Sequence, residues 1–585
     1  MSWQVIHRVR LVVVCIALLQ SACGEQANTF TPDAQVIVIG AGLSGLSAAV
    51  EMGRSGLDVL LIDMNSVAGG HAMLAGGVAM VDTPLQQRQG IEDSVELAYR
   101  DWIDWTEDGD AEWTRYYARY SREMIYDWVT EMGVEFVRVV PGHGNSVPRF
   151  HFTQGRAAHL VLPIYRTALN MPNISFRWNT RADELLLEGK RVIGVKVQDL
   201  RSGELNRLYA DNVVLATGGF ETDVERVLQN WIPGLPQPDR LLIGAAVSAT
   251  GSGHDMATDA GAALARIDRH YIYVNGIIDP RDQQQRHALT AGNDDSLWLN
   301  AGGRRFTNEA GFDKDILVDL LQQESSSYWM VFDEATRERF GVRGAAWLKT
   351  PSQDHPILDN PHVTKRAQSL RELADIAGLP IEEFVESVQA FNAMIDAGED
   401  TAFGRFVDRD SAPPKVQQPP FYALQMFPMT RKNMGGVAID DEARVLDKSG
   451  QVLPGLYAVG ELNGSLGING KHGLDGMFLG PAIVSGRLAG RSIVAATSAT
   501  RMAPEVLSSE PSSHREQWQA TMQPQDLKVL LGQSRDGFWH FQVSHNLVLE
   551  RAYSCSQCHS AQLPFASVSD RASRLLQTEV CTTCH

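Results

Sequence analysis

The chain has 585 residues, which exceeds the size of a single hydrophobic core, so we expect roughly two to four structural units. Hydrophobic residues make up 44% of the sequence and charged residues 21%, an ordinary balance for a soluble globular protein. A formal net charge of -18 argues against nucleic acid as a partner, because phosphate binding needs a basic surface.

The first residues have the pattern of an export signal. Basic residues at 7–10 precede an apolar run over 11–19, which is too short to cross a hydrocarbon core of roughly 30 Å as a helix. We therefore predict a signal peptide over 1–22. Small residues before Cys23 are similar to a lipoprotein processing site, although Gln20 stands where such sites carry Leu. A lipid anchor at Cys23 is the favoured interpretation, and simple secretion or a short buried helix stay open.

A dinucleotide-binding pattern follows this segment. Residues 35–39 predict a buried strand and residues 43–54 a helix, with a Gly-x-Gly-x-x-Gly turn between them. The first glycine permits the turn, the second lets the backbone approach a diphosphate, and the third allows close packing of helix and strand. A second strand over 59–62 ends at an acid that can bind the adenosine ribose. The predicted cofactor contacts here are Gly40, Gly42, Leu43, Ser44, Gly45 and Asp63.

Five later segments carry a resemblance to a known family. These segments are 69–77, 215–220, 250–257, 454–461 and 480–483. In this order they resemble the FAD-dependent fumarate reductase and flavocytochrome c family, over about residues 33–498. The resemblance implies that the dinucleotide is FAD, with further contacts from Gly69, Gly70, His71, Gly76, Gly77, Ala182, Ala216, Thr217, Gly218, Asp255, Gly460, Glu461, Ala482 and Ile483.

Some members of this family attach FAD covalently through a His in the loop that corresponds to the one around His71. The loop in this chain is shorter than theirs. We therefore favour a non-covalent contact between His71 and the flavin, with a covalent bond as the alternative.

The resemblance also implies the domain organisation. We expect an α/β fold in which a Rossmann-like FAD-binding domain, residues 33–264 and 416–498, is interrupted by an α+β cap at 265–415. The Ser/Pro-rich residues 499–525 indicate a linker. Residues 526–585 then form a small, mainly helical segment that we expect to carry two haems.

The cap motif Gly303-Arg304-Arg305-Phe306-Thr307-Asn308-Glu309 is similar to that of the fumarate-reducing members. In those members an Arg on the cap donates a proton, and His and Arg side chains hold the substrate carboxylates. At the corresponding positions this chain has Phe312 for the proton donor, Lys432 and Tyr273 for two His residues, and Met477 near a clamping Arg. We therefore expect a substrate other than fumarate.

Residues 471–482 also resemble the Gly-Pro-Ala segment of 3-ketosteroid dehydrogenases, which use a Tyr as base and a backbone amide at the carbonyl oxygen. This resemblance makes Tyr271 and Tyr273 candidate acid/base groups, with Lys432 or His472 as electrophile or proton donor. For each of the four residues, a purely structural role is the alternative.

The last residues contain two Cys-x-x-Cys-His motifs. This motif attaches a c-type haem through two thioethers, and its His ligates the iron. The attachment residues are Cys555, Cys558, Cys581 and Cys584, and the predicted iron ligands are His559 and His585 with distal His540 and His545. His514 or Met522 are alternative distal ligands, and a four-cysteine zinc site is the alternative to haem. The resembling family usually carries its haem domain at the N-terminus instead.

Cysteine usage agrees with export. Of the six cysteines, Cys15 lies in the predicted signal and four lie in the haem motifs, so only Cys23 is left, as suits acylation. We expect a periplasmic oxidoreductase, with a lipid anchor at Cys23 as the favoured interpretation. It would exchange hydride between FAD and a small organic substrate and relay electrons through two c haems. Its redox partner would be a periplasmic or membrane cytochrome or a quinol-linked donor. A dehydrogenase that feeds the haems, and an electron carrier without a substrate, are the alternatives.

Overall fold

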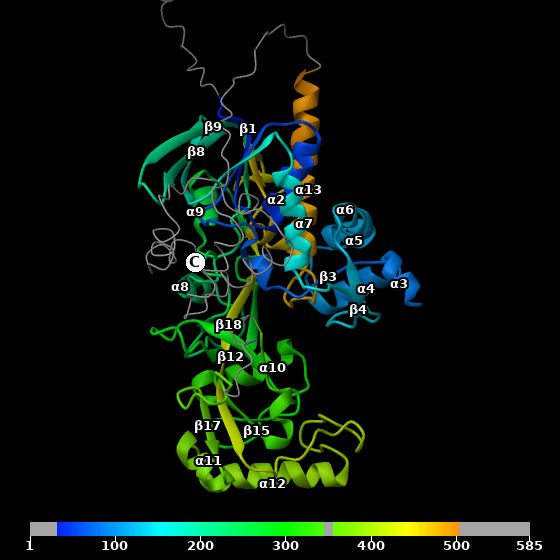
Figure 1. The fold of residues 1–585 in the computed structure, drawn as a ribbon, viewed down its shortest axis with the longest axis vertical. Coiled ribbons are helices and arrows are strands. Elements are labelled where there is room, and N and C mark those ends of the chain that lie inside the picture. The colour runs from blue at the N-terminus through cyan, green and yellow to red at the C-terminus, as the bar shows by residue number, and fades with distance from the viewer. Residues whose placement is uncertain (1–31, 344–354, 502–585) are drawn as a thin grey trace, which may run out of the picture.

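The computed structural model describes residues 32–343 and 355–501. Two sheet-based lobes lie one above the other in Figure 1, and a smaller helical lobe projects from the side of the upper one. The haem motifs, the export signal and Cys23 lie outside the described residues. No helix in the described ranges is long and apolar enough to cross a membrane.

The upper lobe contains a mainly parallel sheet. Its strand order is β20 (Arg444–Leu446), β21 (Val452–Ala458), β9 (Leu205–Leu215), β1 (Ala34–Ile39), β2 (Val59–Ile62) and β6 (Ile174–Arg177). In the central strand β1, Val36, Ile37 and Val38 have no exposed surface, because layers cover both faces of the sheet. The predicted α/β fold with a parallel nucleotide-binding sheet is confirmed for the described residues.

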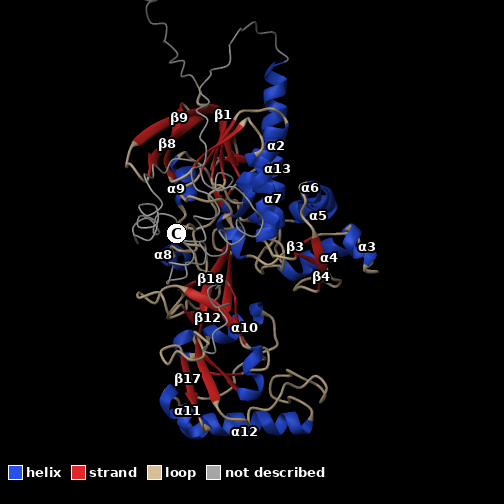
Figure 2. Ribbon diagram, viewed as in Figure 1, coloured by secondary structure: helices blue, strands red, loops and turns tan. Residues whose placement is uncertain are grey.

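Helices cover one face of this sheet, and strands together with a helix lie on the other (Figure 2). The covering helices are α2 (Leu43–Arg54), α7 (Ala158–Leu169) and α13 (Leu479–Arg501). A Cβ on Gly486 would lie 2.3 Å from the carbonyl oxygen of Ser44, so α13 and α2 pack in backbone contact. The opposite layer contains β7 (Thr180–Glu188), β8 (Arg191–Asp199) and α9 (Ser252–Asp259).

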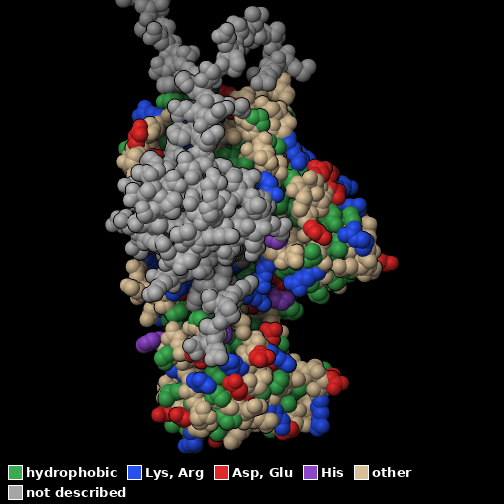
Figure 3. Space-filling view, in the orientation of Figure 1, with side chains coloured by type: hydrophobic (Ala, Val, Ile, Leu, Met, Phe, Trp, Pro, Cys, Tyr) green, Lys and Arg blue, Asp and Glu red, His purple; other side chains and the backbone are tan. Residues whose placement is uncertain are grey.

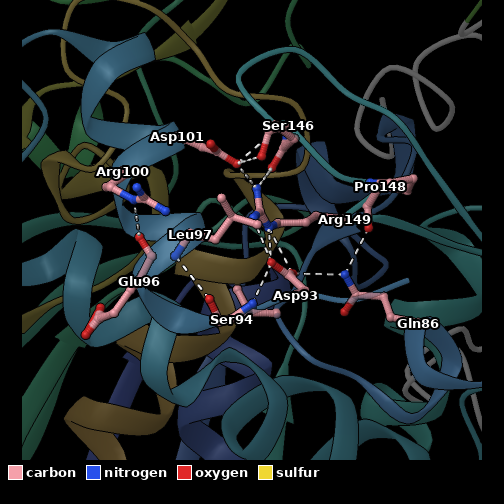
Figure 4. A network of polar contacts seen from close by, with 12 residues as sticks. Gln86, Asp93, Ser94, Glu96, Leu97, Arg100, Asp101, Ser146, Pro148 and Arg149 are labelled. Atoms are coloured by element: carbon pink, nitrogen blue, oxygen red, sulfur yellow. Dashed lines mark hydrogen bonds and ion pairs between the residues drawn. The ribbon is translucent and has the colours of Figure 1, made fainter. Parts of the chain in front are cut away.

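The side lobe is held together by a buried ion network around Arg149 (Figure 4). Its elements are β3 (Val78–Ala79), α3 (Pro84–Arg88), α4 (Val95–Thr106), α5 (Ala111–Ser121), α6 (Trp128–Glu131), β4 (Phe136–Val140) and β5 (Phe150–Thr153). The Arg149 guanidinium has no exposed surface and pairs with Asp93 at 2.7 Å and with Asp101 at 2.5 Å. Asp93 lies just before α4 and Asp101 lies within it, whereas Arg149 immediately precedes β5, so the network joins α4 to the start of β5.

The lower lobe contains the second sheet. Its order is β14 (Leu297–Leu299), β15 (Tyr328–Asp333), β18 (Phe421–Asn433), β12 (His270–Ile278), β13 (Ala288–Gly292) and β16 (Gly341–Arg343), and β10 (Leu242–Ile243) and β17 (Thr364–Ala367) also pair with β18. Helices α10 (Asp313–Leu321), α11 (Leu370–Ala377) and α12 (Ile381–Ala397) pack around it. Acidic and basic side chains are interspersed over this lobe (Figure 3).

Strand β18 links the two lobes. It runs from the lower lobe toward the upper sheet (Figure 1), where Lys432 and Asn433 end it. The second sheet thus takes strands from both sides of residues 265–415, the range predicted for the cap. The C-terminal end of β18 therefore reaches the loop after β2 and the turn after β21 in the upper lobe.

Candidate active site

The glycine-rich turn after β1 is shaped for a diphosphate. Gly40 has φ +110°, and a Cβ there would lie 2.4 Å from the carbonyl oxygen of Ala216. A Cβ on Gly45 would lie 1.9 Å from the carbonyl oxygen of Gly40, whereas one on Gly42 would meet no atom within 4 Å. Gly40 and Gly45 are therefore needed for packing, and Gly42 faces open space at the start of α2, where an anion is favoured.

A cleft of about 730 Å³ opens in front of this turn. Its lining includes the predicted contacts Gly40, Gly42, Asp63, Gly70, His71, Ala182, Ala216, Thr217 and Gly218. The carboxylate of Asp63 accepts hydrogen bonds from the amides of Ala41 and Asn65, each at 2.7 Å. Burial raises the pKa of this carboxyl group. Asp63 thus fixes the glycine turn while it borders the cleft.

The other predicted contacts surround the cleft in different ways. The amide of Gly69 donates to the carbonyl of Ala41 at 2.9 Å, and that of Gly460 donates to Ser485 Oγ at 2.9 Å. Leu43 and Ser44 form the first turn of α2, and Ala482 and Ile483 that of α13. None of these residues is among those that line the cleft, and the same holds for Gly45, Glu461, Gly76, Gly77 and Asp255. Gly76 and Gly77 pack against β5, and Asp255 pairs with Arg226.

A buried charged cluster stands at one end of the cleft. Lys432 Nζ lies 2.9 Å from His71 Nδ1 and 3.2 Å from Glu461 Oε2. The amide of Asn433 donates to Glu221 Oε1 at 2.6 Å and to Glu461 Oε1 at 3.1 Å. These contacts bring the end of β18, the loop after β2 and the turn after β21 to one point.

The cluster sets unusual protonation states. Burial lowers the pKa of His71 to about 4, so its imidazole is neutral near pH 7. Burial and the neighbouring Glu461 raise the pKa of Glu221 well above its usual range. Burial alone would also raise the pKa of Glu461, but the charge of Lys432 holds it well below its usual range. Glu461 is therefore the ionised carboxylate and Glu221 the protonated one.

The cleft and cluster fit a bound dinucleotide. Within the described residues, His71 Nε2 is buried without a hydrogen-bond partner, although His71 lines the cleft. A Cβ on Gly218 would also meet no atom within 4 Å. An open cradle at two glycines and a buried ring nitrogen without a partner are features that a bound cofactor would complete.

A second cavity, of about 1040 Å³, lies between α4 of the side lobe and α10 of the cap. We call it the substrate cavity. The ring of Phe312 contacts the rings of Trp105 and His143 edge-on, at centroid distances of 4.9 and 5.1 Å, which docks the start of α10 against the side lobe. The cavity is lined by Trp105, Glu107, His143, Ile232, Pro233, Leu235, Arg269, His270, Tyr271, Ile272, Asp313, Lys314, Leu317, Val318, Lys471, His472 and Gly473.

Tyr271 connects this cavity to the charged cluster. It is the register partner of Lys432 across the pairing of β12 with β18. Its ring stacks on Phe478 at 5.8 Å, and Lys432 Nζ lies 5.9 Å from the centre of the same Phe478 ring. The ring of Phe478 therefore lies near both Tyr271 in the cavity wall and Lys432 in the charged cluster.

The four predicted catalytic residues fall into three places. Tyr271 and Tyr273 lie together, with ring centroids 5.0 Å apart, and burial raises the pKa of both phenols, which therefore stay protonated near pH 7. His472 lies at the cavity wall, 3.3 Å from Glu107. Lys432 belongs to the charged cluster, and neither Lys432 nor Tyr273 is among the residues that line the cavity.

Sequence reasoning missed the acidic and histidine side chains that meet at this cavity. Asp313 and His143 both line it, and the amide of His143 donates to Asp475 Oδ2 at 2.9 Å. These residues lie far apart in the sequence, and no motif links them. The available signal was the position of Asp313 shortly after the cap motif, at the start of a helix.

Comparison with known proteins agrees with this geometry. A family model described as "FAD binding domain" matches residues 35–479. The chain is 32% identical over 565 residues to the KsdD-like steroid dehydrogenase Rv0785 of Mycobacterium tuberculosis, covering 82% of this chain and 99% of that protein. It is 32% identical over 463 residues to the fumarate reductase (cytochrome) of Shewanella frigidimarina, covering 78% of this chain and 76% of that protein.

The fold is also similar to that of a solved structure. The open conformation of a flavocytochrome c3 fumarate reductase matches with a TM-score of 0.66 and 26% identity, over 82% of this chain and 80% of that one. The family match covers both the glycine turn and the substrate cavity. This chain therefore belongs to the FAD binding domain family and is an FAD-dependent oxidoreductase related to fumarate reductases and ketosteroid dehydrogenases.

Proposed function

We propose that this protein exchanges a hydride between FAD and a carbon–carbon bond of an apolar, ring-containing organic molecule. The favoured direction is reduction of an activated C=C bond, such as that of an enone or aryl-enoate, and not of fumarate. When bound, FAD supplies the hydride chemistry. The chain's own residues bind and orient the substrate and transfer a proton to or from it.

The observation that carries this proposal is the lining of the substrate cavity. Apolar side chains and the rings of Trp105 and Tyr271 form much of its wall. Among the described residues that line it, Arg269 is the single arginine, and its guanidinium is paired with Asp108 and Asp268, each at 2.9 Å. A dicarboxylate such as fumarate would find no free arginine there, whereas an apolar ring would find apolar walls.

The protonated phenols give this cavity a way to activate an enone. Tyr271 and Tyr273 have pKa values raised by burial, so near pH 7 they donate hydrogen bonds and do not act as bases. Such a donor stabilises negative charge that develops on a carbonyl oxygen when hydride adds to the conjugated carbon. Tyr271, which of the two tyrosines lines the cavity, therefore supports binding of a carbonyl group at the β12 wall.

We also propose that two c-type haems on the Cys555 and Cys581 motifs relay electrons between the flavin and a periplasmic or membrane redox partner. The two Cys-x-x-Cys-His motifs support this part of the proposal. Covalent haem attachment and the basic-then-apolar start of the chain favour a periplasmic location, with a lipid anchor at Cys23. A pyridine haemochrome spectrum of the purified holoprotein, and the intact mass of its C-terminal peptide, test for two haems against a zinc site.

A second candidate is dehydrogenation of an apolar ketone with electrons passed to the haems. The 32% identity to a KsdD-like steroid dehydrogenase over 99% of that protein's length favours it. Both directions use the same cavity and the same flavin. An electron carrier without a substrate has no evident use for a cavity of this kind near the charged cluster.

Turnover assays distinguish these functions. Holoprotein is supplied with reduced methyl viologen and a panel of fumarate, cinnamate, 2-cyclohexenone and 4-androstene-3,17-dione, and products are identified by mass spectrometry. The saturated forms of the two ketones are then offered as electron donors, with an oxidised dye as the electron acceptor. Reduction of a ring enone or cinnamate supports the proposal, oxidation alone supports the second candidate, and rapid turnover of fumarate alone contradicts both.

A further inference from the structure

The substrate cavity contains a carboxyl group that stands alone. Asp313 lines the cavity, and its carboxyl group has no hydrogen bond or ion pair within the described residues. Other charged side chains of the lining have a partner within the described residues. Glu107 pairs with Lys471 and His472, Arg269 pairs with two aspartates, and Lys314 lies 4.4 Å over the ring of Trp105.

Asp313 is held in place by its own helix. It is the first residue of α10, and the preceding Phe312 packs edge-on against Trp105 and His143. These ring contacts fix the start of α10 against the opposite wall of the cavity. The carboxyl group is therefore positioned by packing, and its oxygens are left free for a ligand.

Groups from each neighbouring element act on this carboxyl group. His143 and Asp475 face it from the upper and side lobes, Arg343 from β16, and Tyr271 and Tyr273 from β12, while Lys314 follows it on α10. Burial raises the pKa of Asp313 to about 6; Asp475 acts in the same direction, and His143 and Arg343 oppose it. A group that titrates there can both hold and release a proton near neutral pH.

We propose that Asp313 is the catalytic acid and base of the substrate cavity. This inference rests on the proposed function, and it assigns the proton step to a cap residue that the sequence motifs did not single out. In the direction of reduction, one carbon of the C=C bond receives a hydride, and thus two electrons, from the bound flavin. The neighbouring carbon receives a proton from the Asp313 carboxylic acid. Asp313 remains as a carboxylate and takes a replacement proton from water, and dehydrogenation reverses each transfer.

The tyrosines are less suited to the same step. Their phenols donate to a carbonyl oxygen while they remain protonated, but a phenol with a raised pKa is a weak acid toward carbon near pH 7. Asp313 and the phenols then have separate roles. The phenols donate hydrogen bonds to the carbonyl oxygen, and the Asp313 carboxyl group transfers the proton to or from carbon. The location of Asp313 on the cap also ties proton transfer to the docking of α10.

The test compares Asp313→Asn, Asp313→Glu and Asp315→Asn holoproteins. Asp315 lies on the same helix and is exposed, so it is a matched control outside the cavity. Each variant is assayed with reduced methyl viologen and either 2-cyclohexenone, cinnamate or 4-androstene-3,17-dione between pH 5 and 9. FAD content and the rate of flavin reduction by dithionite report on folding and cofactor binding. Infrared difference spectra between pH 5 and 8 report the titration of the carboxyl group without turnover.

We expect Asp313→Asn to bind FAD normally, to lose kcat by on the order of 100-fold or more, and to lose the limb of the pH profile near pH 6 together with one carboxylic-acid band. Asp313→Glu should restore part of kcat, and the limb of its pH profile should lie at a different pH. Asp315→Asn should match the unaltered protein in both kcat and pH profile. An active unaltered protein whose kcat and pH profile survive Asp313→Asn would overturn this inference alone. An unaltered protein inactive toward every compound in both directions would overturn the proposed function and this inference with it.

Discussion

Lys432 Nζ lies 2.9 Å from Nδ1 of His71, so the end of β18 is joined to the loop that follows the glycine turn. The same ammonium group lies 3.2 Å from Glu461. A strand that belongs to the cap sheet thus delivers a positive charge to the end of the dinucleotide cleft. This contact couples the two lobes chemically as well as through the backbone.

Replacement of Lys432 by Met should make the bound flavin harder to reduce. Reduction adds negative charge, and the variant loses the cation that lies at this end of the cleft. We expect the flavin midpoint potential to fall by on the order of 30 mV or more, with reduced FAD content. Spectroelectrochemical titration measures the shift. The exposed Lys448→Met, between β20 and β21, is the control, and an unchanged flavin potential in Lys432→Met would show that this cation does not act on the flavin.

Two glycines of the turn should respond differently to alanine. Gly45→Ala puts a Cβ 1.9 Å from the carbonyl oxygen of Gly40, so the turn must shift and the protein should lose thermal stability. Gly42→Ala meets no protein atom within 4 Å, so the apoprotein should keep its stability but lose affinity for FAD. Thermal unfolding of apoprotein and holoprotein measures both effects. Equal FAD affinity in Gly42→Ala and unaltered protein would show that the diphosphate does not approach this glycine.

The buried network of Figure 4 should be a major source of stability for the side lobe. Arg149→Met leaves Asp93 and Asp101 without their buried cation, and we expect a loss of about 3–5 kcal/mol in the free energy of unfolding. Arg115→Met removes an exposed pair with Glu96 and should cost less than about 1 kcal/mol. Urea unfolding compares the two variants. Similar losses of unfolding free energy in both would refute the conclusion that the buried Arg149 network stabilises the side lobe.

The stability of the protein should depend on pH through His254. Burial lowers the pKa of this side chain from 6.5 to about 3, so the unfolded chain takes up a proton in that range while the folded chain does not. Its contribution is therefore complete above pH 6.5 and is lost as the pH falls toward 3.

His254→Phe tests this dependence, because Phe fills a similar volume beside Phe220. We expect the decrease in free energy of unfolding between pH 7 and pH 5 to be smaller by about 2 kcal/mol in this variant. Urea unfolding at the two pH values measures the difference. The exposed His362→Phe should leave the decrease unchanged, and a His254→Phe variant with the unaltered pH dependence would disprove the linkage.

The elements with local signals were predictable. The helix expected over 43–54 and the strand over 59–62 match α2 and β2, because a buried apolar run, a glycine turn and a terminal acid lie within a short stretch. These signals depend on neighbouring residues and not on distant packing. The parallel sheet around the turn follows from the same pattern.

The substrate cavity was not predictable in the same way. Its Asp313, His143 and Tyr271 come from three separate elements, and they meet because β18 spans the lobes and Phe312 docks α10 on Trp105. The sequence therefore identified Phe312 as the place where an expected proton donor is missing, but not the carboxyl group beside it. Which residues of the cap face the cavity depends on the docking of the lobes.

A stopped-flow experiment tests the central claim most directly. Anaerobic holoprotein, reduced by stoichiometric dithionite, is mixed separately with 4-androstene-3,17-dione, 2-cyclohexenone, cinnamate and fumarate, and the flavin and haem absorbances are recorded together. The account predicts flavin reoxidation, followed by the haems, with a ring enone or cinnamate and none with fumarate. Rapid reoxidation by fumarate, with no response to the other three compounds, would contradict it.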